Sequence, residues 1–247
     1  MARQIPGFSG ADIANLVNEA AIRTTKQDRD RITHKDIEES IERIALGHGR
    51  TEIRYSKDEK LMIAFHEAGH ALLELHFIKY NDFHKVSILG RGQISGYTVS
   101  FPKREHSFAS QEQLMAELIC LFGGRVAEWR KFKSRSTGAA DDLQKASMLA
   151  YIMITKFGMN DVIGPVSIAG LASQTADYDV AQQGNILGLY IFDEVKKILQ
   201  IAETEAEKLI DQYSLHLEAV ANEMLERETL YKADIDNIVA SISYKNT

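Results

Sequence analysis

Residues 66–70 read His-Glu-Ala-Gly-His, the pattern H-E-x-x-H. His66 and His70 are four positions apart, so an α-helix would place both imidazole rings on one face, where they can reach one ion. The flanking sequence predicts such a helix over residues 56–80. Ser56 can cap its first turn together with a glutamate three residues later, and apolar residues recur at helical spacing. The motif therefore predicts a long helix that carries both histidines on one side.

Two neutral imidazoles suit Zn²⁺, which in catalytic sites takes three protein ligands and keeps one position open for water. Glu67 follows the first histidine, where its carboxylate can take a proton from that water as a general base. The alternative interpretation is a helix whose two histidines are packed or solvated. Gly69 argues against it, because a glycine inside a helix costs about 1 kcal/mol relative to alanine. That cost predicts the close approach of another group to the helix backbone.

The third ligand has to come from another element. Glu74 lies two turns beyond His66, about 12 Å along the helix axis, which is too far for both to share one ion. The best segment is 136–143, which reads S-T-G-A-A-D-D-L and places two carboxylates in the first turn of a helix. The helix dipole stabilises an ionised carboxylate there, and that is the form that binds metal.

Asp142 is the preferred ligand of the two. The residues that follow it on the same helix face are all apolar, whereas the face below Asp141 includes a lysine. The alternative is that both are simple first-turn acids, which is the commonest role for such residues. His84 and Glu128 are weaker candidates for the third ligand, and Glu128 could instead hold an imidazole by a hydrogen bond.

The composition excludes several classes of protein. The net charge of −6 gives no basic surface, so a nucleic-acid partner is not expected. The single cysteine, Cys120, excludes an internal disulfide and a cysteine-rich zinc site, and it lies in an apolar helical run that predicts a core position. The sequence shows no signal peptide and no apolar run near the ~18 residues that a membrane span needs, so we expect a soluble chain without membrane contact.

The periodicity predicts a mainly α fold with one small β-sheet. The chain has three prolines, which favours long helices. Helices are expected over 10–26, 33–47, 56–80, 110–131, 137–157, 184–212, 215–227 and from 232 to the C-terminus; a β-hairpin over 85–101; and a short strand over 163–169. A polar, glycine-containing link near residue 50 predicts a boundary between a small helical unit, 1–50, and a larger domain, 51–247.

Several sequence blocks resemble one known family in the family's own order. They are FHEAGHAL at 65–72, HKVSI at 84–88, GYT at 96–98, GGRVAE at 123–128 and STGAADDL at 136–143. Together they resemble the peptidase domain of FtsH-type, membrane-anchored AAA+ zinc metalloproteases. Residues 6–21 resemble the start of that family's helical AAA+ lid.

The resemblance implies a helical zinc peptidase domain over 51–247, preceded by a partial AAA+ lid over 1–50. It implies an endopeptidase that degrades unfolded or membrane-derived proteins, is coupled to an AAA+ unfoldase, and assembles as a homo-hexamer. In the full-length family protein the site would lie on the cytoplasmic face of the inner membrane. The implied residues are the zinc ligands His66, His70 and Asp142, the catalytic Glu67, and the substrate-binding strand residues Gly96, Tyr97, Thr98 and Val99.

Two features depart from the family pattern. Asp141 stands where the family usually has asparagine, and the segment 129–135 is shorter and more basic than expected. The sequence also contains no G-x-x-x-x-G-K-[ST] phosphate-binding motif, so we expect no ATPase activity from this chain alone. The alternative function is a regulatory or assembly subunit of such a protease complex, without a motor.

Overall fold

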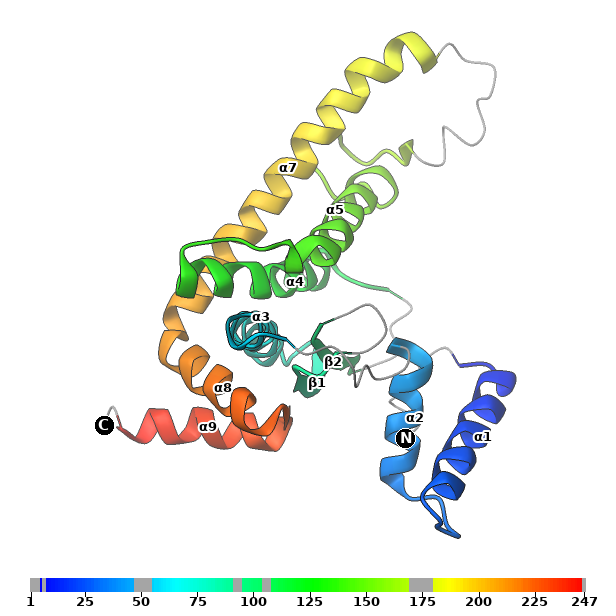
Figure 1. Cartoon of the computed structure of the whole chain (residues 1–247). Helices are drawn as coiled ribbons and strands as arrows, with labels where there is room; N and C mark the ends of the chain where they lie inside the picture. Colours follow the sequence, from blue (N-terminus) through cyan, green and yellow to red (C-terminus); the bar gives the residue numbers. More distant parts are fainter. Residues whose placement is uncertain are drawn as a thin grey trace.

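The structure is a computed structural model, and it describes residues 5, 8–46, 55–90, 95–103, 108–168 and 180–245. Within these ranges the chain is mainly helical with one small antiparallel sheet, as the sequence predicts (Figure 1). The helices are α1 (Gly10–Lys26), α2 (His34–Leu46), α3 (Lys57–His76), α4 (Gln111–Phe132), α5 (Ala140–Thr155), α7 (Val180–Gln212), α8 (Ser214–Arg227) and α9 (Lys232–Lys245). A short 3-10 helix, η2 (Thr137–Ala139), precedes α5. None of the described helices combines the length and apolar character that a bilayer span requires.

Helix α3, which carries the H-E-x-x-H motif, begins at the predicted cap. The Ser56 N–H donates to Glu59 Oε2 (2.8 Å), and the Glu59 N–H donates to Ser56 Oγ (3.2 Å), which closes the capping box. The predicted end at residue 80 is wrong, because α3 stops at His76. The chain turns at Phe77, whose carbonyl accepts the Tyr80 N–H (2.9 Å), and then enters the sheet.

The sheet has the strand order β2-β1-β3, with strands β1 (Asn81–Ser87), β2 (Tyr97–Pro102) and β3 (Thr229–Tyr231). The hairpin of β1 and β2 is the predicted one, although β1 starts four residues before the expected range. A β-bulge interrupts their register between Phe83 and Lys85. Strand β3 is too short for an alternating pattern, so the sequence gives no sign of it.

The short strand predicted over 163–169 is wrong for the residues that the structure describes, and Ala169 lies outside them. Asn160 Oδ1 accepts the N–H groups of Val162 (3.0 Å) and Ile163 (2.9 Å), which bends the backbone into a turn. Gly164 has φ of +79°, a left-handed conformation that suits glycine. Local hydrogen bonds therefore override the strand preference of these apolar residues.

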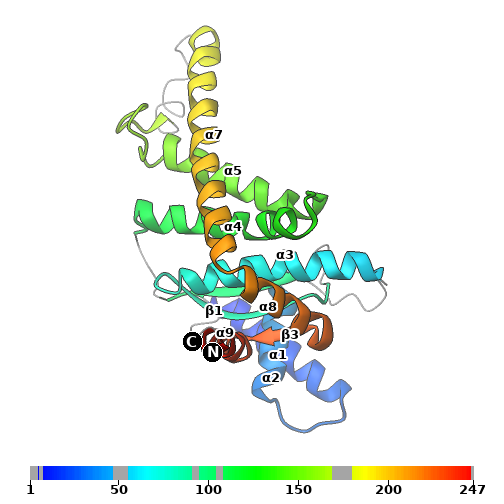
Figure 2. The same ribbon diagram turned by 90° about the vertical axis from the view of Figure 1, so that its left-hand side faces the viewer.

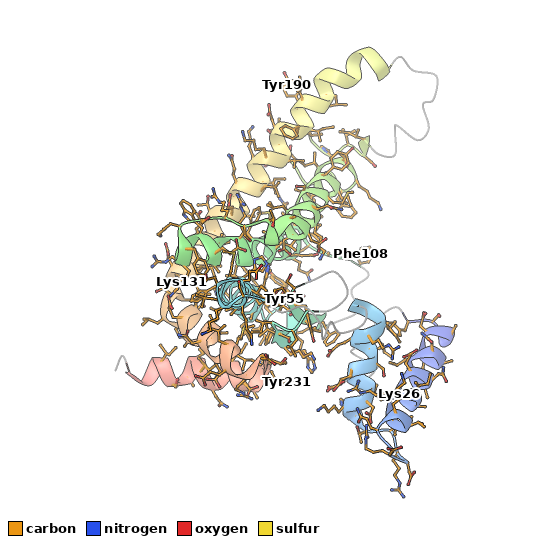
Figure 3. All side chains as sticks on the ribbon, in the orientation of Figure 1. Lys26, Tyr55, Phe108, Lys131, Tyr190 and Tyr231 are labelled. Carbon is orange, nitrogen blue, oxygen red and sulfur yellow. The ribbon has the colours of Figure 1, made fainter. Side chains whose placement is uncertain are left out.

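The main core forms where α3 packs against α4, α8 and the sheet, and where α4 packs against α5 and α7 (Figures 1–3). Cys120 is part of this core, as predicted. The close approach predicted at Gly69 is confirmed: a Cβ there would lie 2.3 Å from the Gly123 carbonyl oxygen on α4. The two glycines let the backbones of α3 and α4 touch, and this contact fixes the motif helix in the core.

A smaller core joins α1 and α2 through Leu16, Ala20, Ile37 and Ile41. The turn between the two helices is held by Asp36, whose Oδ2 accepts the Thr33 N–H (2.8 Å) and an N–H of the Arg29 guanidinium (2.8 Å). The predicted boundary near residue 50 lies outside the described residues.

Helix α2 lies against the face of the sheet opposite α3 (Figure 2). The bulge turns two consecutive β1 side chains toward α2. His84 Nε2 lies 3.6 Å from Glu38 Oε1, and Lys85 forms a buried ion pair with Glu42. The sheet thus separates the α1–α2 pair from α3.

Candidate metal centre

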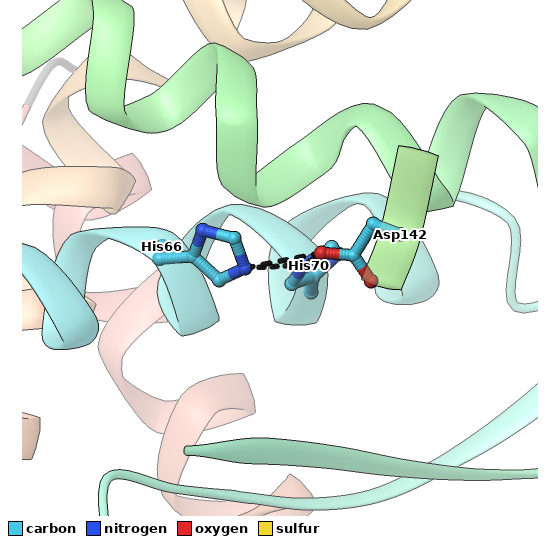
Figure 4. Close-up of side chains that lie close together, drawn as sticks. All are labelled: His66, His70 and Asp142. Atoms are coloured by element: carbon cyan, nitrogen blue, oxygen red, sulfur yellow. Dashed lines mark hydrogen bonds and ion pairs between the residues drawn. The ribbon is translucent and has the colours of Figure 1, made fainter. Parts of the chain in front are cut away.

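Helix α3 holds His66 and His70 on one face, as the spacing predicts. Their Nε2 atoms lie 3.1 Å apart (Figure 4). Asp142 enters from the first turn of α5 and places Oδ2 3.3 Å from His66 Nε2 and 3.4 Å from His70 Nε2. The structure therefore brings together the three residues that the sequence predicts as ligands, from two helices that are far apart in the chain.

The spacing of these three atoms fits a small divalent cation. A tetrahedral zinc site with bonds of roughly 2.0–2.1 Å has neighbouring ligand atoms about 3.3 Å apart. The three measured separations of 3.1, 3.3 and 3.4 Å lie close to that value. Among the described residues, these three form a cluster that could hold a metal ion.

The other ring nitrogens have acceptors of their own. His70 Nδ1 donates to the Cys120 carbonyl (2.9 Å), so its Nε2 keeps a free lone pair. His66 Nδ1 lies 2.7 Å from Glu128 Oε1, a residue only 1% exposed. Ser136 anchors Glu128 in turn, since its N–H donates to Oε2 (2.8 Å) and its hydroxyl to Oε1 (2.9 Å). These bonds fix the two rings so that both Nε2 atoms face Asp142.

The placement of Glu128 separates it from the candidate ligands. It contacts the ring nitrogen of His66 that points away from Asp142, so it holds the imidazole and is not positioned as the third ligand. His84, the other weaker candidate, lies on the far side of the sheet beside Glu38. The sequence pattern does not predict the anchoring roles of Ser136 and of the Cys120 carbonyl, and a backbone carbonyl leaves no trace in the sequence.

Asp141 and Asp142 differ as the helix faces predict. The Asp142 side chain is 18% exposed and faces the histidines, whereas the Asp141 side chain is 61% exposed and pairs with Lys145 (2.6 Å). The Asp142 face continues into the buried residues Ala146 and Met153. Asp141, which stands where the family usually has asparagine, is thus directed away from the site.

The site favours positive charge. Burial alone would lower the pKa of His66, but hydrogen bonds to Asp142 and Glu128 outweigh it and raise this pKa to about 10. Burial tends to raise the pKa of Asp142, but hydrogen bonds with His66 and His70 hold it well below its usual range. A proton on the histidines and a divalent cation would compete for this same electronegative position.

Glu67 points toward β2. It is 6% exposed, and the Thr98 hydroxyl donates to its Oε2 (3.0 Å). Burial raises the pKa of Glu67, and the nearby histidines His66 and His70 oppose the rise. A raised pKa makes a carboxylate a stronger base, which suits proton transfer near neutral pH.

Two of the four predicted substrate-strand residues reach the site. Thr98 bonds to Glu67, and the backbone at Gly96 comes so close that a Cβ there would lie 2.8 Å from Glu67 Oε1. Tyr97 faces the other way and donates to Glu42 Oε2 on α2 (3.1 Å). Val99 pairs in register with Lys85 of β1.

Gly124 lies directly against the metal-site histidine. A Cβ at this position would lie 2.4 Å from both Cε1 and Nε2 of His66. The second glycine of the GGRVAE block therefore provides the space that the His66 ring occupies.

A helix that carries H-E-x-x-H, with an aspartate converging from a second helix, places this chain among the metallopeptidase-like proteins. The family model described as peptidase family M41 matches residues 53–238, and the AAA+ lid domain model matches residues 1–39. The chain belongs to peptidase family M41.

Individual relatives agree with this assignment. The chain is 39% identical over 244 residues to the "ATP-dependent zinc metalloprotease FtsH" of Endomicrobium trichonymphae, covering 97% of this chain and 38% of the relative. It is 40% identical over 252 residues to "ATP-dependent zinc metalloprotease FtsH 4" of Sorangium cellulosum, covering 97% and 38%. It is 37% identical over 241 residues to the "ATP-dependent zinc metalloprotease FtsH" of Aster yellows witches'-broom phytoplasma, covering 98% of this chain and 35% of the relative. The chain thus spans less than two fifths of the length of these curated relatives.

Proposed function

We propose that this chain is a zinc-dependent endopeptidase in which His66, His70 and Asp142 hold the metal. The observation that carries the proposal is the convergence of these three donor atoms at separations of 3.1–3.4 Å. When bound, zinc supplies a Lewis acid that polarises a peptide carbonyl and lowers the pKa of a water to about 7. The names of the relatives, which are zinc metalloproteases, support this choice of metal.

Glu67 is the proposed general base. Its buried carboxylate accepts a proton from the attacking water and returns it to the leaving amine. The raised pKa of Glu67 supports both halves of this transfer, because the carboxyl group can hold the proton between the two steps. The Nδ1 partners of His66 and His70 keep the rings oriented throughout.

The proposed substrate site is β2, with Gly96, Tyr97, Thr98 and Val99. In the described part of the sheet, β2 has β1 as its one neighbouring strand, so its other edge can pair with an extended polypeptide. Main-chain pairing requires an unfolded segment and imposes little sequence preference, which supports unfolded protein as the substrate class.

The wider assembly is proposed from the resemblance and from the relatives' names. We infer that residues 1–50 form a partial AAA+ lid and 51–247 the peptidase domain, consistent with the matched ranges of the two family models. In the whole protein the peptidase would be a homo-hexamer coupled to an AAA+ unfoldase, at the cytoplasmic face of the inner membrane. The relatives' description as ATP-dependent supports the coupling.

The direct test is Glu67→Gln in the purified, zinc-loaded chain, with casein as an unfolded substrate. Removing a positioned general base should lower cleavage by about 10²–10⁴-fold while zinc content stays unchanged. Glu74→Gln is the matched control, since it makes the same change on the same helix. The Glu74 carboxylate accepts a hydrogen bond from the Asn81 side chain (3.1 Å) and has no proposed role in the reaction. Cleavage that survives in Glu67→Gln would refute the assignment. A zinc-loaded wild-type chain that never cleaves would instead favour a regulatory or assembly subunit.

A further inference from the structure

The carboxylate of Glu67 faces strand β2. Among the described residues, the hydrogen-bond donor that the structure places on this carboxylate is the Thr98 hydroxyl, 3.0 Å from Oε2. Gly96, two residues earlier on the same side of the chain, brings its backbone so close that a Cβ would lie 2.8 Å from Glu67 Cγ and from Oε1. Thr98 therefore bonds to one oxygen of the side chain, and the backbone at Gly96 passes close to the other.

The position of Thr98 is fixed by the sheet. Thr98 pairs in register with Val86 of β1, and Val86 is fully buried in the core beneath α3. The preceding residue, Tyr97, points to the opposite face and is held there by its bond to Glu42 on α2 (3.1 Å). A β-branched side chain on a pleated strand also has few accessible rotamers. The hydroxyl thus reaches Glu67 from a strand that is held on both faces.

We propose that Thr98 is a positioning residue for Glu67: its hydroxyl holds Oε2 and fixes the rotation of the carboxylate that transfers the proton. This role rests on the proposed function and adds to the substrate contact expected of the strand. A carboxylate has about four lone-pair positions, so one bond from Thr98 orients the group and leaves other positions free to accept a proton. Holding a base within a narrow range of orientations is a large part of its catalytic value.

The kinetic test compares Thr98→Val, which keeps the β-branched shape but removes the hydroxyl, with Thr98→Ser, which keeps the hydroxyl. We expect Thr98→Val to lower kcat for a fluorogenic unfolded peptide by about 10–100-fold with KM unchanged, and Thr98→Ser to recover most of the loss. The control is Thr24→Val on α1, which makes the same substitution at a buried threonine whose hydroxyl donates to the Ala20 carbonyl (2.8 Å). A rise in KM alone would make Thr98 a substrate contact and overturn the proposal, as would an unchanged kcat.

A second readout needs neither zinc nor activity. Thermal unfolding in chelator is measured for Thr98→Val, for Glu67→Ala and for the double variant. We expect Thr98→Val to lower the Tm by about 2–4 °C when Glu67 is present and to leave it unchanged in the Glu67→Ala background. Equal losses in both backgrounds would show that Thr98 does not act through Glu67 and would overturn the proposal. If the zinc-loaded wild-type chain cleaves nothing, the proposed function and the catalytic role of Thr98 fail together, and the unfolding cycle still decides whether Thr98 holds Glu67.

Discussion

Gly124→Ala is a one-carbon perturbation aimed at the metal-site histidine. The added Cβ would lie 2.4 Å from both Cε1 and Nε2 of His66, whereas ordinary van der Waals contact begins near 3.4 Å. The ring must therefore move by about 1 Å to reach ordinary contact distances. His66 cannot move freely, because its Nδ1 is bonded to Glu128 at 2.7 Å.

The size of this displacement sets the expected effect. Metal–ligand distances tolerate about 0.2 Å, so a shift of about 1 Å should remove His66 from the ligand set or weaken zinc binding strongly. Catalysis should fall by about 10²-fold or more for a misplacement of this size. The fold should suffer less, because overpacking costs about 1–3 kcal/mol while alanine in a helix regains about 0.5–1 kcal/mol over glycine.

Two other glycines serve as references for the assay, which measures zinc content, kcat and thermal unfolding of each purified variant. Gly188→Ala on α7 makes the same substitution where, beyond the adjoining backbone, no atom of the described residues lies within 4 Å of the new Cβ, so it should keep full zinc and equal or raised stability. Gly69→Ala would place its Cβ 2.3 Å from a backbone oxygen of Gly123, so it should damage the α3–α4 contact and the fold itself. If Gly124→Ala bound one zinc with unchanged affinity and cleaved at the wild-type rate, the reasoning from this geometry would be refuted.

Two further predictions concern buried carboxylates. Glu128→Gln replaces the charged acceptor of His66 by a neutral one, and zinc affinity measured by chelator competition should fall about 10–100-fold; unchanged affinity would contradict the anchoring role. In the α1–α2 turn, hydrogen bonds from Arg29 and then Thr33 lower the pKa of Asp36. The stability that Asp36 contributes is therefore present above the unfolded pKa of about 3.9 and is lost as pH falls below it. In urea unfolding, the free energy of unfolding of the wild type should exceed that of Asp36→Asn by a constant amount from about pH 7 to 5, and this difference should shrink toward pH 2. A difference that grows in acid would contradict the prediction.

Much of the fold can be predicted because the helices carry their own local signals. The capping box at Ser56 and the apolar spacing that follows define the start of α3 without any tertiary information. The end of α3 and strand β3 depend on long-range pairing, since β3 forms only where β1 supplies a partner. The error at 163–169 has a local cause, because an asparagine side chain and a left-handed glycine form a turn in a stretch rich in β-branched residues.

The candidate site, like the fold, has one part that the sequence predicts and one part that depends on long-range pairing. The helical period links His66 to His70, and the apolar helix face below Asp142 is enough to distinguish it from Asp141. The bond from Thr98 to Glu67 depends on the register of β1 and β2, which a bulge shifts between Phe83 and Lys85. No local pattern in the sequence encodes that register.

The most direct test of the metal centre is the zinc stoichiometry and affinity of the purified chain compared with Asp142→Asn and Asp141→Asn. The two variants make the same chemical change at adjacent positions, one facing the histidines and one paired with Lys145. We expect one tightly bound zinc per chain in the wild type and in Asp141→Asn, and strongly weakened binding in Asp142→Asn. Full zinc affinity in Asp142→Asn, or its loss in Asp141→Asn, would contradict the assignment of His66, His70 and Asp142 as the metal centre.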